Sequence, residues 1–559
     1  MIAMNIVILV SCIIIGEYMA EATDDLIVEL IQPRGKIRGH TLVSAKSNEY
    51  YAFQEIPYAA PPVGENRFKP PKSHQGWEGI LDTTKNTKKC YQFQTFIPSE
   101  LKNGGSDDIA MSEDCLFLNV YTPVKPGSEK ALPVYFFIHG GANAVGDGTY
   151  ASLGPKYLID GEIVIVTMNY RLGPFGYLSI HHKDNSGNMA LKDQHMALQW
   201  THRNIHLFGG NPKDIVLGGQ SSGAFSAGFH LLSPKTEGLI TAVIQQSGSP
   251  LSAAAYMASA KRFALTLGRA LDPSITAHNN SHLIETLKKA SPKDIQTASL
   301  KVSSPYPLGF MQSPSTWGPV VENHNSDEAF ITTPMHQAFM RGHFHQVPAL
   351  IGFNSQEAIF FLPHDDSVLE EAAARFDSDP SMLVEETLRV ENRTLVGIEL
   401  RAAYTSKTFK NDFSALVEFT SDVVFMHPSI RQAELSSKHV PVYLYQLSAG
   451  KNVNDRFPGI AHGADLKYFW KMQSSFDHSP VDESIREVLL RLWWNFIKYK
   501  NPTPRRDVVL KNIEWPPVEP ENIRYLNISE DMNIGTNPSN YSVIKGVLEK
   551  YIRPPYYIF

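Results

Sequence analysis

Continuous apolar runs, rich in β-branched and aromatic residues, recur from one end of this chain to the other. They do not alternate with polar residues, which is typical of strands buried on both faces of a parallel sheet. The runs predict strands at Val134–Ile138, Ile163–Met168, Ile215–Leu217, Val243–Gln246, Ala349–Phe353 and Val440–Gln446.

Segments with helical spacing of apolar residues lie between these strands. They predict helices at Ala190–Asn204, Ser259–Leu271 and Ile485–Tyr499. The alternation indicates an α/β fold with a large, mostly parallel, twisted sheet flanked by helices. No repeat or flexible linker divides the chain, so we expect one domain over residues 23–559, carrying long insertions.

The composition is that of an ordinary globular protein, with 43% hydrophobic and 19% charged residues among 559. A net charge of −6 over this length offers no basic face for nucleic acid, so we expect no nucleic-acid partner.

The N-terminus predicts a secretory signal peptide at residues 1–22. An apolar run from Ile6 to Ile15 is too short to span a bilayer, and Ala20-Glu21-Ala22 is a small-x-small cleavage site. The alternative is a buried N-terminal helix, since the run is preceded by no Lys or Arg. No later stretch is long and apolar enough for a membrane anchor, so we expect a secreted, extracellular protein.

The cysteines and glycosylation motifs suit the same route. Once Cys12 leaves with the signal peptide, Cys90 and Cys115 remain, either as a disulfide or as two buried thiols; a secretory route favours the bridge. N-glycosylation motifs occur at Asn279, Asn392, Asn527 and Asn540.

A G-x-S-x-G motif at Gly219–Gly223 follows one of the predicted strands and opens a run of small residues that can start a helix. This strand–turn–helix setting strains the turn and exposes the hydroxyl of its serine, Ser221. An ordinary turn is the alternative, because small residues also cluster by chance.

A serine nucleophile needs a base, and the base needs an acid to fix its tautomer. In this architecture the expected chain order is Ser, acid, His. Glu357 follows the strand Ala349–Phe353, and His462 follows the strand ending at Gln446. Any one of 20 histidines is more often structural than catalytic, but position and order single out His462.

Small residues after the strand Val134–Ile138 provide a candidate oxyanion site. The sequence His139-Gly140-Gly141-Ala142-Asn143 leaves backbone N–H groups free to point at a negative charge, together with the N–H of Ser222. A plain turn is the alternative for a glycine pair after a strand.

Further ordered segments complete the pattern, and the chain resembles the type-B carboxylesterase/cholinesterase family over nearly all its mature length. The matching segments are Glu113–Tyr121, the turn at His139, Asn169–Gly173, Asp193-Gln194, Asn204-Ile205 with Phe208–Pro212, the Ser221 elbow, Gln246–Ser249 and the segments around Glu357 and His462. The resemblance implies an α/β-hydrolase fold whose insertions form a gorge or lid. It implies a Ser221–Glu357–His462 triad, oxyanion donors at Gly141, Ala142 and Ser222, a Cys90–Cys115 bridge, and no cofactor or metal.

Departures from the family indicate the kind of substrate. Gln220 stands where many members have Glu before the nucleophile. In having Gln at this position the chain is similar to insect juvenile hormone esterases, although their usual elbow has Ala where this chain has Ser222. No Trp lies between the two cysteines, so the cation–π platform of cholinesterases is missing. Ala253 and Ala254 stand where relatives carry a bulky acyl-pocket aromatic, and Asn143 stands where an aromatic usually follows the oxyanion turn.

These features predict a serine hydrolase that cleaves neutral, fairly bulky or lipophilic carboxylic esters through an acyl-enzyme. Its partner would be a small-molecule ester, such as a xenobiotic, hormone or odorant ester. The alternative is a catalytically silent relative that acts as a secreted binding or adhesion protein. Such relatives typically lack the serine, the acid or the histidine, whereas this chain has all three.

Overall fold

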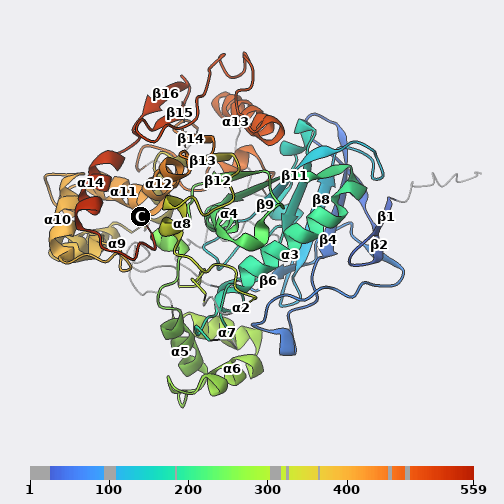
Figure 1. Cartoon of the computed structure of the whole chain (residues 1–559), viewed down its shortest axis with the longest axis horizontal. Coiled ribbons are helices and arrows are strands. Elements are labelled where there is room, and N and C mark those ends of the chain that lie inside the picture. Colours follow the sequence, from blue (N-terminus) through green and yellow to red (C-terminus); the bar gives the residue numbers. More distant parts are fainter. Residues whose placement is uncertain are drawn as a thin grey trace, which may run out of the picture.

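The computed structural model describes residues 26–93, 109–182, 185–302, 316–322, 327–362, 365–450, 456–472 and 479–558, so the predicted signal peptide lies outside the described residues. Within these ranges, eleven strands form one sheet in the spatial order β16-β15-β14-β13-β12-β11-β9-β10-β8-β4-β3 (Figure 1). The bounds are β3 His40–Val43, β4 Glu49–Pro57, β8 Phe117–Thr122, β9 Leu132–Ile138, β10 Val164–Met168, β11 Gly210–Gln220, β12 Ala242–Gln246, β13 Ala349–Asn354, β14 Val442–Leu447, β15 Arg524–Ile528 and β16 Asn533–Thr536.

The centre of the sheet is parallel and its two ends are antiparallel. From β15 across to β10 every neighbouring pair runs parallel. At one end β16 pairs antiparallel with β15, and at the other β8, β4 and β3 continue the sheet in antiparallel pairs. All six predicted strands are confirmed as parallel central strands, and β11 extends further in both directions than predicted.

Side chains of the central strands alternate between two separate cores, which explains their continuous apolar sequences. In β9, Val134 and Phe136 belong to one core with residues of α3, whereas Tyr135 and Phe137 belong to another with residues of α13. Both faces of the sheet are therefore covered by helices, as the alternation of elements predicts.

The helices include all three that the sequence predicts. Their bounds are α1 Tyr150–Leu153, α2 Gly173–Tyr177, α3 Met189–Asn204, α4 Ser222–Leu232, α5 Ala260–Leu271, α6 Asn280–Lys289, α7 Pro292–Ser299, α8 Met335–Met340, α9 Asp366–Ser378, α10 Arg393–Ala402, α11 Phe413–Ser421, α12 His427–Ser436, α13 Pro480–Tyr499 and α14 Tyr541–Tyr551. The last predicted helix begins five residues early, at Pro480, because Ser479 caps it by accepting a hydrogen bond from the Asp482 N–H and proline suits the first helical turn.

The helices outside the two covering layers form two groups. In Figure 1, α5, α6 and α7 gather at the bottom of the view, and α9, α10, α11 and α14 gather at the left, below β15 and β16. Two small sheets, β1-β2-β5 and β6-β7, lie outside the main one; their strands are β1 Ile27–Leu30, β2 Gly35–Arg38, β5 Ile80–Asp82, β6 Lys88–Cys90 and β7 Ala110–Ser112. No helix in the described ranges has the length and apolar character needed to cross a membrane.

Candidate active site

Ser221 lies in the sharp turn between β11 and α4. Its φ of 57° and ψ of −126° are strained for a residue with a side chain, which is the conformation of a nucleophile elbow. Glycine is required on both sides: a Cβ on Gly219 would lie 2.2 Å from the Gly223 carbonyl oxygen, and one on Gly223 would lie 2.1 Å from the Ile138 carbonyl oxygen. The local sequence thus permits the close strand–helix approach that holds Ser221 at the carboxyl edge of the sheet.

His462 and Glu357 form a buried pair at the same edge. The imidazole Nδ1 lies 2.7 Å from Oε2 of Glu357. The backbone N–H of His462 also donates to the backbone carbonyl oxygen of Glu357 at 3.2 Å. The second carboxylate oxygen accepts a hydrogen bond from the Asn354 N–H at 2.6 Å. Because both oxygens are engaged and Glu357 is fully buried, the carboxylate is held in one orientation toward the imidazole.

The other ring nitrogen of His462 faces Gln220. The two Nε2 atoms lie 3.2 Å apart, and a neutral imidazole that donates from Nδ1 to Glu357 can accept the amide N–H at Nε2. The structure thus brings Glu357 and His462 into contact, and Gln220, the residue before Ser221, reaches the same imidazole. Among the described residues, no hydrogen bond joins the Ser221 hydroxyl to His462. Catalytic hydrogen bonds often tighten only when substrate is bound.

Three phenylalanines surround the imidazole, and they are not among the residues predicted from the sequence. The ring centroids of Phe360, Phe361 and Phe425 lie 5.8, 5.3 and 4.4 Å from that of His462. Phe360 and Phe361 closely follow Glu357, so their position in the chain was a usable signal. Phe425 lies in a single turn of π-helix at Asp422–Met426, a feature frequent at functional sites, but no motif marks it.

A buried polar network anchors the loop that carries His462. Asp465 accepts hydrogen bonds from Gln246 at 2.6 Å and from Asn354 at 3.4 Å, and Asn354 also donates to the Ala461 carbonyl oxygen at 2.8 Å. Burial, reinforced by the nearby Glu357 carboxylate, raises the pKa of Asp465 above its usual value. Gln246 and Asn354 end β12 and β13, so the loop is tied to two strands of the sheet.

The candidate oxyanion turn follows β9 and has an unusual backbone. Gly141, Ala142 and Asn143 have consecutive φ values of 116°, 53° and 60°. The Gly141 carbonyl oxygen accepts from the N–H groups of Ala144 and Val145, and the Asn143 N–H donates to the Ser222 hydroxyl at 3.3 Å. In the described part of the chain, the N–H groups of Gly141, Ala142 and Ser222 have no acceptor, so they are available to an oxyanion.

The predicted pocket alanines lie in a short 3₁₀ turn, Ala253–Ala255, within the core cluster that contains Phe425. Ala253 is buried and Ala254 partly buried. Ser252 caps this turn and donates to the Val424 carbonyl oxygen at 2.7 Å, which links it to the π-helical turn beside His462. Asn143 is also buried.

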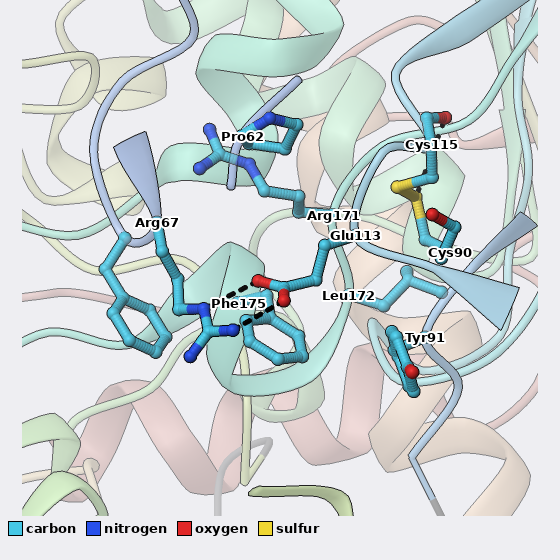
Figure 2. Close-up of a pocket in the computed structure, with 11 residues that line it drawn as sticks. Pro62, Arg67, Cys90, Tyr91, Glu113, Cys115, Arg171, Leu172 and Phe175 are labelled. Carbon is cyan, nitrogen blue, oxygen red and sulfur yellow. Dashed lines mark hydrogen bonds and ion pairs between the residues drawn. A yellow bond between two sulfur atoms is a disulfide. The ribbon is translucent and has the colours of Figure 1, made fainter. Parts of the chain in front are cut away.

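Cys90 and Cys115 form the expected disulfide, with the sulfurs 2.07 Å apart. Figure 2 shows a small pocket beside it, lined in part by Arg67, Glu113 and Arg171. Arg67 pairs with Glu113 at 2.5 Å, and Arg171 pairs with Asp193 at 2.6 Å. Since each guanidinium has a carboxylate partner, this pocket is no anion site. No group of three or more metal-ligating side chains gathers among the described residues.

The fold is that of an α/β-hydrolase, and comparison with known proteins agrees. The profile of the carboxylesterase family matches residues 24–544. A carboxylic ester hydrolase of Bombus ignitus is 30% identical over 535 residues, 91% of each chain. Juvenile hormone esterase of Tribolium castaneum is 30% identical over 540 residues, 88% of this chain and 87% of the other.

A solved structure supports the same assignment. The crystal structure of juvenile hormone esterase from Manduca sexta, with OTFP covalently attached, superimposes with a TM-score of 0.82 at 26% identity, covering 94% of this chain and 99% of that one. The chain belongs to the carboxylesterase family, and it is a carboxylic ester hydrolase.

Proposed function

We propose that this protein cleaves neutral, fairly bulky or lipophilic carboxylic esters through an acyl-enzyme on Ser221. The observation that carries this proposal is the 2.7 Å contact between His462 Nδ1 and Glu357, at the edge of the sheet where the strained Ser221 stands. Glu357 fixes the imidazole with its proton on Nδ1, which leaves Nε2 as the base.

In the first half-reaction, Ser221 Oγ attacks the acyl carbon while its proton passes to Nε2 of His462. The carbonyl oxygen becomes an oxyanion and accepts hydrogen bonds from Gly141, Ala142 and Ser222. Collapse breaks the bond to the alcohol oxygen, which leaves with the proton from Nε2. Water then repeats the sequence on the acyl-enzyme and releases the acid.

The neutral and apolar preference follows from the surroundings of the imidazole. Gln220 provides no negative charge beside the reacting centre, so a cationic alcohol group gains little Coulomb attraction there. Phe360, Phe361 and Phe425 offer apolar surface around His462. Juvenile hormone is one lipophilic ester worth testing, because two relatives are named juvenile hormone esterases.

We also propose that residues 1–22 are a signal peptide and that the mature chain is secreted. The Cys90–Cys115 disulfide supports an oxidising compartment. Expression in insect cells, followed by sequencing the N-terminus of the protein in the medium, tests this. A chain retained in the cells with an intact N-terminus would contradict it.

The decisive test of the mechanism is Ser221→Ala. We expect it to retain the fold but less than about 1% of kcat, a barrier increase of at least about 2.7 kcal/mol. Ser226→Ala is the matched control, since this buried serine lies on α4 and pairs with Gln194. If the wild-type protein formed no covalent organophosphate adduct and hydrolysed no ester, the alternative would hold: a catalytically silent binding protein.

A further inference from the structure

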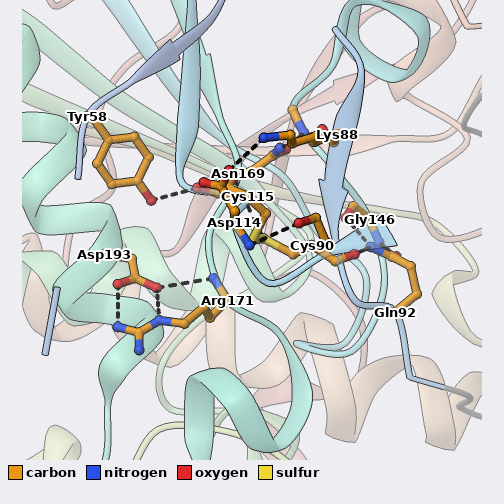
Figure 3. Close-up of a disulfide and its surroundings, with 12 residues drawn as sticks. Tyr58, Lys88, Cys90, Gln92, Asp114, Cys115, Gly146, Asn169, Arg171 and Asp193 are labelled. Carbon is orange, nitrogen blue, oxygen red and sulfur yellow. Dashed lines mark hydrogen bonds and ion pairs between the residues drawn. A yellow bond between two sulfur atoms is a disulfide. The ribbon is translucent and has the colours of Figure 1, made fainter. Parts of the chain in front are cut away.

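Gln92 connects Cys90 of the disulfide to Gly146, three residues after the candidate oxyanion turn Gly141–Asn143 (Figure 3). Its side chain pairs with both backbone groups of Gly146: Oε1 accepts the Gly146 N–H at 2.6 Å, and Nε2 donates to the Gly146 carbonyl oxygen at 3.1 Å. The same Nε2 also donates to the Cys90 carbonyl oxygen at 2.8 Å. The next residue, Phe93, donates its N–H to the Ala144 carbonyl oxygen at 2.7 Å.

The chain that carries Gln92 is itself fixed to the main sheet. Cys90 ends β6 and is bonded to Cys115, which stands two residues before β8. Lys88 of β6 pairs with Asp114 at 2.6 Å. Gln92 therefore extends from a rigid support, and a side chain whose backbone is fixed loses little freedom when it holds a partner.

Gly146, in turn, packs directly against the start of the oxyanion turn. A Cβ at Gly146 would lie 2.4 Å from the Gly140 carbonyl oxygen and 2.6 Å from Nδ1 of His139. That Nδ1 lies 2.8 Å from the same Gly140 oxygen. The orientation of the Gly140–Gly141 peptide is thus limited by Gly146, which Gln92 holds in place.

The turn needs such support because its backbone is unfavourable. Ala142 and Asn143 both have positive φ values, which cost free energy in residues with side chains. Without an outside constraint, the turn would relax and its N–H groups would move off the oxyanion position. We propose that Gln92 is a positioning residue for the oxyanion turn, acting through Gly146; this rests on the proposed function of Gly141 and Ala142 as donors.

The test compares Gln92→Met with Gln296→Met. The first removes the amide that pairs with Gly146 while keeping side-chain length. The second removes an amide that donates to the Gln92 backbone carbonyl oxygen at 2.6 Å and leaves the Gln92 side chain in place. Kinetics with a neutral chromogenic ester are normalised by active-site titration with an organophosphate. Because oxyanion contacts act in the transition state, Q92M should lower kcat about 10- to 100-fold and change KM less than threefold.

Inhibition by an aliphatic trifluoromethyl ketone supplies the second readout. Its adduct with the serine places an oxyanion on the same donors, so its affinity should fall with kcat in Q92M and stay at the wild-type value in Q296M. A purely structural role would lower the melting temperature of Q92M and leave kcat per titrated site and ketone affinity unchanged, which would overturn the inference. Failure of the proposed function is distinct, because then wild type itself would show neither turnover nor ketone inhibition.

Discussion

The amide nitrogen of Gln220 lies 3.2 Å from Nε2 of His462, on the side of the ring opposite Glu357. The imidazole therefore has a carboxylate on one nitrogen and a neutral amide on the other. An amide can form a hydrogen bond with either protonation state of the His462 imidazole. Its nitrogen donates to an unprotonated Nε2 and, after rotation of the amide, its oxygen accepts from a protonated Nε2. A carboxylate in its place could only accept and would favour the imidazolium.

Gln220→Glu should therefore move the acid limb of the kcat/KM profile to higher pH. A carboxylate within contact distance of an imidazole typically shifts such a titration by about one to three pH units. The shift would remove the base form of His462 at neutral pH and lower activity there. The measurement is kcat/KM for a neutral ester from pH 5 to 9.

Gln220→Met is the control for that experiment, because it removes the amide without adding charge. Its acid limb should stay near that of wild type even if activity falls. Equal profiles for the Glu and wild-type enzymes would show that position 220 does not govern the proton on His462.

The central strands and the Ser221 elbow were predictable because each leaves a local signal. Strands β9 to β14 are apolar on both faces, and the elbow carries its own motif. The antiparallel end formed by β8, β4 and β3 was not predicted: β4 has an irregular register between Phe53 and Ile56, with Glu55 at a φ of 59°, which interrupts any regular pattern.

The contacts that complete the site arise only when distant segments meet. Phe425 reaches His462 through a π-helical turn that no periodicity marks. Likewise, Gln92 meets Gly146 across 54 residues of sequence. Such pairs depend on the tertiary fold, and a single sequence carries no local trace of them.

The four glycosylation motifs should differ in occupancy. Asn279 and Asn392 are exposed and cap α6 and α10 with their side-chain oxygens, so the caps leave the nitrogen available for a sugar. Asn540 is half-buried and uses that nitrogen to donate to Glu418, and Asn527 lies within β15 and donates to Asn533.

In protein secreted from insect cells, we expect glycans at the first two sites and none at the last two. Enzymatic deglycosylation in heavy-oxygen water followed by peptide mass spectrometry reads each site separately. Full occupancy of Asn540 would contradict the contacts around it.

Glu385 should make the stability of the protein depend on pH. Burial raises the pKa of this carboxyl to about 7, and its Oε1 has no hydrogen-bond partner among the described residues. Because the folded pKa lies above the ordinary value of 4.5, the folded state holds the proton more tightly than the unfolded chain. The stability that this group contributes is therefore full below about pH 4.5. It falls as the pH rises to about 7, by at most about 1.4 kcal/mol for each pH unit in that interval.

Glu385→Gln should accordingly raise the melting temperature at pH 8 and leave it nearly unchanged at pH 4.5. The amide oxygen can still accept from the Thr387 N–H, which now donates to the carboxylate at 2.8 Å. Glu370→Gln is the matched control, since its side chain is exposed and Glu370 is not among the groups that shift the pKa of Glu385. Parallel melting curves for wild type and E385Q at both pH values would count against the buried, protonated carboxyl.

Ala254 should govern the length of acyl group that the enzyme accepts. The turn Ala253–Ala255 is small and tied through Ser252 to the segment that carries Phe425, so a larger side chain at Ala254 would take up space in the apolar cluster that both belong to. Ala254→Val and Ala254→Trp should progressively favour acetyl over butyryl esters. Two methylenes that lose their buried position can cost about 1.6 kcal/mol, or about 15-fold in the ratio of kcat/KM.

Phenyl or nitrophenyl esters of acetic and butyric acid provide the measurement. The control is Ala254→Ser, which adds one oxygen and should keep the wild-type ratio. If the Trp variant retained that ratio with full triad activity, the acyl group would have to lie elsewhere.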